Sequence, residues 1–294
     1  MIDTPQGIIP AMVTPLTPDD EINELALRKL TNYLIEGGVH GLFPTGSQGE
    51  FWALSADEKR RVWEVVVEGT NGRLPVYAGT AAITTRETIT LTRLAEKAGV
   101  DAVSILTPFY VAPNDAELYD HYRAIAEATS LPVVLYTNPA RTGVKISPDL
   151  LARLAEIENI VGIKDSSGDL ELTAEYIRVA PPDFAVLMGR DTLILAGLLY
   201  GAKGAIAATA NVAPALVVSI YERFKAGDLD GAKRAQVALA PLRLAFSWGT
   251  FPVVIKEALD LIGMEGGPAR APVGPLSPEQ RERLRGVLHD MGLI

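Results

Sequence analysis

Residues 133–164 read VVLYTNPARTGVKISPDLLARLAEIENIVGIK and contain one complete strand–helix–strand unit. The apolar runs Val133–Tyr136 and Val161–Lys164 are typical of buried strands, and Pro148–Ala155 between them has the apolar spacing of a helix. Because neither run alternates polar with apolar residues, both faces of the sheet are expected to be covered. The stretch therefore predicts a right-handed crossover in a parallel sheet.

The same alternation of apolar runs and helical patterns continues in both directions, at roughly 30 residues for each repeat. The expected strands are Ile8–Val13, Gly41–Pro44, Val76–Gly79, Ala102–Leu106, Val133–Tyr136, Val161–Lys164, Ala185–Met188 and Ala205–Ala207. The expected helices are Glu24–Glu36, Ala56–Gly69, Thr85–Ala98, Ala116–Ala128, Pro148–Ala155, Leu170–Ala180 and Thr192–Leu199. Eight such units predict an α/β fold, a closed (β/α)8 TIM barrel.

A doubly wound open sheet is the alternative, because periodicity alone does not show whether a sheet closes. Its dinucleotide-binding version is disfavoured, since no Gly-x-Gly-x-x-Gly pattern follows the first strand. After residue 210 the strands stop, and helices are expected at Ala213–Lys225, Leu229–Phe246, Phe251–Ile262 and Pro278–Met291. The first serves as the eighth barrel helix. The prediction is therefore a catalytic barrel at 1–226 and a C-terminal three-helix extension at 227–294.

The composition narrows the class of function. The 294 residues are 48% hydrophobic, enough for a large core, and carry a formal net charge of −9. That charge disfavours nucleic acid and anionic membrane surfaces as partners. The absence of cysteine excludes disulfides and thiolate nucleophiles or ligands. Since no secretory signal or membrane-spanning stretch is recognisable, a cytoplasmic enzyme is expected.

Lys164 has the clearest chemical implication of any residue in the chain. It follows the apolar run Ile160–Ile163, at the end of a strand where desolvating an amine is costly. Burial lowers the pKa of a lysine, and a neutral amine can attack a ketone to form a Schiff base. The alternative is a lysine whose stem passes the strand end so that its amine reaches solvent.

The ends of other strands also carry polar residues, and in a barrel these ends share one face. After the second expected strand comes Thr45–Glu50, TGSQGE, whose glycines allow a tight turn with successive N–H groups directed at an anion. The segment lacks the Gly-Lys-Ser/Thr ending of a Walker loop. It is either a cradle for a carboxylate, in which Ser47 adds a hydroxyl, or an ordinary turn between strand and helix.

Two tyrosines and an arginine lie at similar positions. Tyr136 ends one expected strand and Tyr110 follows another; a phenol hydrogen-bonded to a hydroxyl or to a second phenol can relay protons. Alternatively, each ring covers the end of the barrel core with its hydroxyl in water. Arg141 offers a bidentate fork suited to a carboxylate, although a loop arginine is also compatible with simple solvation.

Taken together, these segments resemble the dihydrodipicolinate synthase and N-acetylneuraminate lyase family of pyruvate-dependent class I aldolases. The resemblance runs from Gly7–Pro15 to the C-terminal helices. Its most specific segments are Gly46–Glu50, Tyr136–Gly143 and Gly162–Asp165, each at the end of an expected strand.

The resemblance implies a role for individual residues. Lys164 matches the Schiff-base lysine, Tyr136 the proton-relaying tyrosine and Ser47 the small hydroxyl residue beside it. Tyr110 falls where synthases carry a second tyrosine, which reaches across a subunit interface into the neighbouring site. The backbone N–H groups of Ser47 and Gln48 would hold the pyruvate carboxylate, in a substrate-binding turn that includes Gly46. Gly189 and Ile206 match positions that line the pocket behind the lysine.

The resemblance also implies a mechanism without cofactor or metal. Lys164 would form an imine with pyruvate, whose methyl carbon then loses a proton and attacks an aldehyde; the reverse reaction would cleave a 2-keto-3-deoxy acid. His40, His121 and His289 are too scattered in sequence to suggest a metal site. The family implies a homotetramer built as a dimer of dimers.

The identity of the aldehyde is less determined. Arg141 matches the arginine with which synthases hold L-aspartate semialdehyde, and Tyr110 favours the same reading. Gln48 departs from both the synthase and the lyase pattern, and Gly249–Glu257 is more similar to the sugar-acid aldolase branch. A synthase using L-aspartate semialdehyde is therefore predicted, with a 2-keto-3-deoxygluconate-type aldolase as the alternative and a non-catalytic family member as a distant one.

Overall fold

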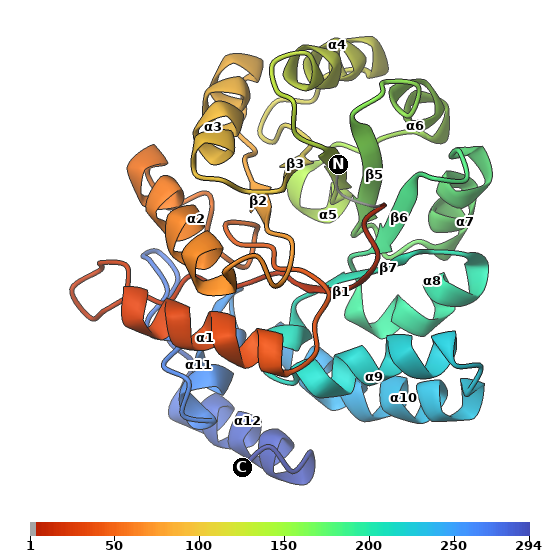
Figure 1. Cartoon of the computed structure of the whole chain (residues 1–294). Helices are drawn as coiled ribbons and strands as arrows, with labels where there is room; N and C mark the ends of the chain where they lie inside the picture. The colour runs from red at the N-terminus through yellow and green to blue at the C-terminus, as the bar shows by residue number, and fades with distance from the viewer. Residues whose placement is uncertain (1–3) are drawn as a thin grey trace.

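The computed structural model describes residues 4–294 and has one seven-stranded sheet, in the order β1-β7-β6-β5-β4-β3-β2. All six strand pairings are parallel. The strands are β1 (Gly7–Pro10), β2 (Tyr77–Gly79), β3 (Ala102–Leu106), β4 (Val133–Thr137), β5 (Ile160–Asp165), β6 (Ala185–Met188) and β7 (Gly204–Ala207). The sheet curls around a central axis and helices surround it, a TIM-barrel-like α/β fold (Figure 1).

Helices follow the strands as the sequence predicts, with ends displaced by less than a turn. They are α1 (Glu24–Glu36), α2 (Ala56–Thr70), α3 (Thr85–Lys97), α4 (Asp115–Ala126), α5 (Pro139–Thr142), α6 (Pro148–Leu154), α7 (Leu170–Val179), α8 (Ile194–Tyr200), α9 (Pro214–Lys225), α10 (Leu229–Ala245), α11 (Val253–Leu261) and α12 (Pro278–Asp290). The short α5 was not predicted. Between residues 4 and 294, no helix is both long enough and apolar enough to cross a membrane.

Side-chain caps explain where several helices begin. Ser55 accepts a hydrogen bond from the Glu58 N–H, and the Glu58 carboxylate accepts one from the Ser55 N–H, so that two backbone donors at the start of α2 are satisfied. Ser277 and Gln280 form the same reciprocal pair at the start of α12. These caps lie on polar residues directly before amphipathic segments, which is why the helix starts are readable from the sequence.

The predicted strand Gly41–Pro44 is wrong as a strand. Leu42 makes only an isolated parallel bridge to the residue before β2, and Phe43 makes one to the residue after β1. Pro44 has no N–H to donate, and Thr45 adopts a left-handed conformation with φ of 53°, so the ladder ends at once. The segment nevertheless lies between β1 and β2, the two outermost strands of the sheet.

Two apolar layers hold the fold together. The inner layer fills the space enclosed by the strands; its buried members are Ile9, Ala11, Phe43, Tyr77, Ala102, Val134, Ala185, Leu187 and Ile206. A larger layer lies between the strands and the helices and includes Leu242 of α10, Val253 of α11 and Leu284 of α12. Since α10–α12 contribute to this layer, the C-terminal helices pack on the barrel through a shared core.

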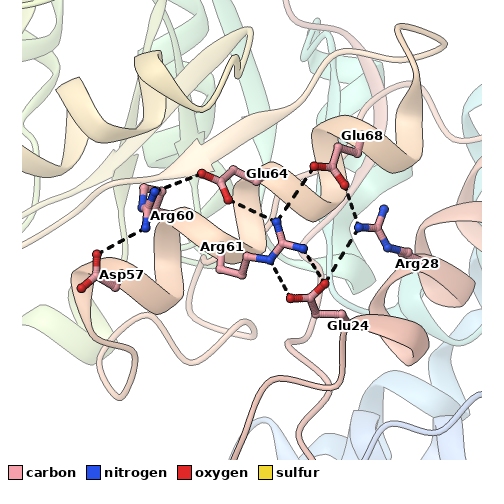
Figure 2. Close-up of polar contacts among 7 residues, drawn as sticks. All are labelled: Glu24, Arg28, Asp57, Arg60, Arg61, Glu64 and Glu68. Atoms are coloured by element: carbon pink, nitrogen blue, oxygen red, sulfur yellow. Dashed lines mark hydrogen bonds and ion pairs between the residues drawn. The ribbon is translucent and has the colours of Figure 1, made fainter.

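Charged side chains connect α1 and α2 on the surface (Figure 2). The Nε and Nη2 atoms of Arg61 each lie 2.6 Å from an oxygen of the Glu24 carboxylate, and Arg28 lies 2.6 Å from Glu68. The bidentate pair lowers the pKa of Glu24 through its hydrogen bonds to Arg61. Because all of these side chains are partly exposed, the network is expected to contribute little on its own and to weaken in salt.

Candidate active site

Lys164 and Tyr136 form the centre of the site. Lys164 is the fifth residue of β5, and the parallel register pairs it with Tyr136 on β4. The Lys164 side chain is only 4% exposed; its Nζ lies 4.2 Å from the centre of the Tyr136 ring and 4.9 Å from that of Phe43. The predicted alternative, an amine extended into solvent, is therefore wrong.

Burial determines the chemistry of Lys164. Desolvation lowers its pKa from the ordinary lysine value, although the nearby Tyr136 and Asp191 act in the opposite direction. Asp191 is itself 2% exposed, and its carboxylate accepts hydrogen bonds from the Thr209 N–H (2.7 Å) and the Ala208 N–H (3.4 Å). The Asp191 carboxylate is thus already held by backbone N–H groups. Burial has the larger effect on the pKa of Lys164 and favours the neutral, nucleophilic amine.

The Tyr136 phenol is surrounded by polar groups. Burial acts to raise its pKa, but the charge of Lys164 and hydrogen bonds from Ser47, Asn138 and Ser166 outweigh burial, so the pKa of Tyr136 lies below the ordinary tyrosine value. The Asn138 amide donates to the phenol oxygen at 3.2 Å. A phenol with a lowered pKa beside an amine is placed to accept and return protons at that amine.

The segment Thr45–Glu50 forms a tight turn beside the lysine. Both of its ends are non-glycine residues in the left-handed region, Thr45 with φ of 53° and Glu50 with φ of 57°. Gly79 of β2 is required underneath, because a Cβ there would lie 2.2 Å from the Thr45 carbonyl oxygen. The close backbone contact fixes the turn against the sheet.

A cavity of about 300 Å³ opens above Lys164. The predicted residues that line it are Ser47, Gln48, Tyr136, Arg141, Lys164, Gly189 and Ile206. Gly46 lies behind them and lines a neighbouring space of about 10 Å³. Tyr110 is not brought to this cavity: its side chain is 95% exposed, on a residue with φ of 72°.

Several residues of the cavity wall were missed from the sequence. Asn138, Ser166, Asp191 and Arg190 directly follow strands, so their position at strand ends was an available signal. The C-terminal helices and their connection contribute Arg243, Phe246, Ser247 and Phe251, for which the sequence gives no local signal. The Arg141 guanidinium stacks 4.1 Å from the centre of the Phe251 ring, which joins the two parts of the wall.

The described part of the chain, from residue 4 onward, holds no group of three or more His, Cys, Asp or Glu side chains arranged to bind a metal ion. His40 contacts the Glu222 carboxylate at 2.9 Å, and His121 contacts the Thr85 hydroxyl at 2.9 Å, so these two imidazoles have separate local partners.

Known proteins match nearly the whole chain. Residues 4–291 match the dihydrodipicolinate synthetase family. The 4-hydroxy-tetrahydrodipicolinate synthase of Methanopyrus kandleri is 42% identical over 98% of this chain and 97% of its own, and that of Archaeoglobus fulgidus is 41% identical over 98% and 99%.

Solved structures of related proteins also match nearly the whole chain. Dihydrodipicolinate synthase from Thermotoga maritima superposes with a TM-score of 0.96 at 33% identity, over 99% of this chain and 100% of its own. The chloride-inhibited synthase from Acinetobacter baumannii, complexed with pyruvate, gives 0.95 at 39% identity, over 98% and 99%. Enzymes of this family are pyruvate-dependent lyases that form a Schiff base on a lysine without an external cofactor. The chain belongs to the dihydrodipicolinate synthetase family.

Proposed function

We propose that this protein is a 4-hydroxy-tetrahydrodipicolinate synthase, which condenses pyruvate with L-aspartate semialdehyde through an imine on Lys164. The observation that carries the proposal is the buried Lys164 amine, 4% exposed and 4.2 Å from the Tyr136 ring at the base of a cavity. The relatives named as this synthase at 42% and 41% identity support the choice of reaction.

The reaction begins at Lys164. The neutral amine attacks the ketone carbon of pyruvate, and loss of water gives a protonated imine. This cation withdraws electrons from the methyl carbon, which loses a proton to give an enamine. The enamine carbon attacks the aldehyde carbon, the aldehyde oxygen takes up a proton, and the imine to Lys164 is regenerated. The amine of the semialdehyde part then attacks the imine carbon, and the bond between this carbon and the Lys164 nitrogen breaks, which releases the cyclic product and the free lysine amine. Tyr136, hydrogen-bonded to Asn138 and Ser47, moves protons at the amine and at the oxygen atoms.

The turn at Gly46–Gln48 is assigned to the pyruvate carboxylate. Successive N–H groups in a glycine-containing turn form an anion-binding concavity, and Ser47 and Gln48 both line the cavity. Gly189 and Ile206 form the wall beside the lysine. A Cβ on Gly189 would lie 2.0 Å from the Ser166 hydroxyl oxygen, so a larger residue there displaces a group that interacts with Tyr136.

The cavity also suits an aldehyde that carries a carboxylate. Arg141, Arg190 and Arg243 line it, and among residues 4–294 none of these three forms an ion pair with a carboxylate. Among the described residues, from 4 to 294, the only acidic one in the wall is Asp191, already held by backbone amides. Such a basic site in a chain of net charge −9 favours an anionic substrate, with Arg141 as the proposed carboxylate ligand.

A 2-keto-3-deoxy sugar acid, such as 2-keto-3-deoxygluconate, is the second candidate substrate. The side-chain oxygen of Gln48 is buried without a hydrogen-bond donor, on a residue that lines the cavity. A substrate hydroxyl would satisfy this oxygen. The two candidates differ in direction: the synthase consumes pyruvate with L-aspartate semialdehyde, whereas the aldolase releases pyruvate from the sugar acid.

The finer architecture remains part of the proposal. The bridges of Leu42 and Phe43 to both outer strands support a closed (β/α)8 barrel with its eighth strand position at Gly41–Pro44. The division into a barrel at 1–226 and an extension at 227–294 stays a prediction, as does a cytoplasmic location. A homotetramer, built as a dimer of dimers, would give the exposed Tyr110 a place in the neighbouring subunit's site.

A direct comparison of substrates tests the proposal. The purified protein is assayed for pyruvate consumption with L-aspartate semialdehyde and for pyruvate release from 2-keto-3-deoxygluconate, and the two kcat/KM values are compared. We expect the first to be larger by at least about a hundredfold, because a site built to pair with polar groups of one substrate discriminates against a substrate that leaves them unpaired. A larger value for the sugar acid would replace the synthase with the aldolase.

A further inference from the structure

A fully buried ion pair links the C-terminal helices to the turn beside Lys164. Lys256 of α11 is 0% exposed, and its Nζ lies 2.5 Å from the Glu50 carboxylate. The same ammonium donates to the Pro268 carbonyl oxygen at 2.6 Å. Glu50, also 0% exposed, is the last residue of the turn Thr45–Glu50.

The second carboxylate oxygen of Glu50 is held as well. It accepts the Arg270 N–H at 2.8 Å, from the loop that follows α11. Arg270 is in turn bound through its guanidinium to Glu58 at 2.5 Å and to Asp20 at 3.0 Å. Each oxygen of Glu50 therefore contacts a group from the C-terminal part of the chain.

The other end of the turn is fixed by the barrel itself. The Thr45 hydroxyl donates to the Gly79 carbonyl oxygen at 3.0 Å and accepts the Trp63 indole N–H at 2.6 Å. Thr45 and Glu50 both have positive φ, a conformation that non-glycine residues avoid unless their surroundings impose it. A turn strained at both ends needs an anchor at both ends, and Glu50 supplies the second.

Stability alone gives little reason for the Glu50–Lys256 pair. Apolar residues of the same volume often serve a buried core as well as or better than an ion pair, because they require no desolvation of charge. Burial lowers the pKa of Lys256, while Glu50 acts to raise it, so the amine is held in an environment that disfavours its charge. Such a pair is better explained by the conformation that it specifies.

We propose that Glu50 and Lys256 are positioning residues that hold the Ser47–Gln48 segment in its pyruvate-binding conformation. The C-terminal extension then contributes to the active site in two ways. Arg243 and Phe251 line the cavity, and Lys256 holds Glu50 at the end of the turn. The inference rests on the proposed role of the turn in binding the pyruvate carboxylate, and it predicts a defect in pyruvate affinity that loss of stability alone does not produce.

Borohydride trapping at a series of pyruvate concentrations, read by intact mass, gives the half-saturating pyruvate concentration without any need for the aldehyde. We expect Lys256→Met to raise this concentration at least tenfold and to lower the Tm. The double variant Glu50→Gln/Lys256→Met no longer buries an unpaired charge. It is expected to recover most of the Tm while keeping the raised half-saturating concentration.

Controls separate the possible failures. Arg281→Met removes the ion pair that Glu257, the next residue of α11, makes with α12; it should lower the Tm and leave pyruvate affinity unchanged. Glu50→Gln keeps the shape of the side chain and an acceptor for the Arg270 N–H. Because burial lowers the pKa of Lys256, its amine can take the neutral form and accept a hydrogen bond from the new amide, so this variant is a second test that buries no unpaired charge. A severalfold rise in the half-saturating pyruvate concentration is expected. The positioning role is overturned if folded variants trap pyruvate like the wild type, or if affinity and Tm recover together. Absence of an adduct in the wild type would instead reject the proposed function.

Discussion

Tyr136 and Lys164 are register partners on the neighbouring parallel strands β4 and β5, which places the amine 4.2 Å from the centre of the phenol ring. This one relationship joins a nucleophile to a group that can move its protons. Each residue changes the pKa of the other. Lys164 lowers the pKa of Tyr136, while the phenol partly offsets the effect of burial on the pKa of Lys164. The proposed chemistry depends on this contact more than on any other.

Tyr136→Phe should slow the reaction while leaving the fold intact. Removing the hydroxyl deletes the proposed proton carrier, and general acid–base groups typically contribute about 10²–10⁴-fold. We therefore expect kcat with pyruvate and L-aspartate semialdehyde to fall by at least about a hundredfold. Tyr33→Phe, which removes a hydroxyl that donates to the Val212 carbonyl oxygen away from the cavity, should keep nearly full activity. Equal losses in both variants would argue against a specific role for Tyr136.

The pH dependence of imine formation should reveal a perturbed lysine. Below its pKa the Lys164 amine is protonated and unreactive, so the rate at sub-saturating pyruvate rises with pH through that pKa. Because burial lowers the pKa of Lys164, the rise should level off below the ordinary lysine value of about 10.4. Trapping rates measured from neutral to alkaline pH check this. A rate that still increases near pH 10.4 would mean that the free amine is not perturbed.

Stability should increase when the buried amine is removed. Since the pKa of Lys164 is lowered on folding, the unfolded chain binds more protons between the lowered pKa and about pH 10.4. The loss of stability caused by burying the charged amine is fully present below the lowered pKa and disappears as pH rises through this window. Lys164→Met should therefore raise the free energy of unfolding near neutral pH by on the order of 1 kcal/mol. The gain over the wild type should shrink as the pH rises from the lowered pKa towards about 10.4, as measured by denaturant unfolding; a destabilised variant at neutral pH would contradict it.

Arg141 and Arg243 should affect the use of the acceptor aldehyde but not the binding of pyruvate. A hydrogen bond to a charged group contributes about 1.5–3 kcal/mol, so Arg141→Ala should lower kcat/KM for L-aspartate semialdehyde by about 10–100-fold. Arg243→Ala should change it in the same direction, because both residues line the same cavity. The half-saturating pyruvate concentration should stay unchanged. Arg178→Ala, which removes only the exposed pair with Glu175, is the matched control. If kcat/KM for L-aspartate semialdehyde is unchanged in Arg141→Ala, the synthase loses its main support over the sugar-acid aldolase.

Much of the fold follows from local patterns. The helix Glu24–Glu36 is found at its predicted ends, and β6 coincides with the predicted run Ala185–Met188, because each begins and ends at residues with clear local preferences. The segment Gly41–Pro44 differs, since its apolar pattern is strand-like but Pro44 and the left-handed Thr45 stop the ladder. The turn that interrupts this strand is part of the site, so the local departure coincides with function.

The site was less predictable than the fold. Residues at strand ends, such as Lys164, Tyr136 and Ser47, could be grouped because parallel strands bring their ends to one face. Phe251 and Arg243 reach the cavity only through the packing of α10 and α11 against the barrel, for which spacing along the chain gives no signal. Tyr110 is 95% exposed in the single chain, so its predicted role depends on a neighbouring subunit.

The most direct test of the account is reductive trapping of the pyruvate imine. The wild type and Lys164→Ala are incubated with pyruvate and borohydride, and intact mass is followed by peptide mapping. The account predicts one pyruvate-derived adduct per chain, located on Lys164 and absent from the variant. A folded wild type that forms no adduct, or forms it on another lysine, would contradict the assignment of Lys164 as the nucleophile and with it the proposed mechanism.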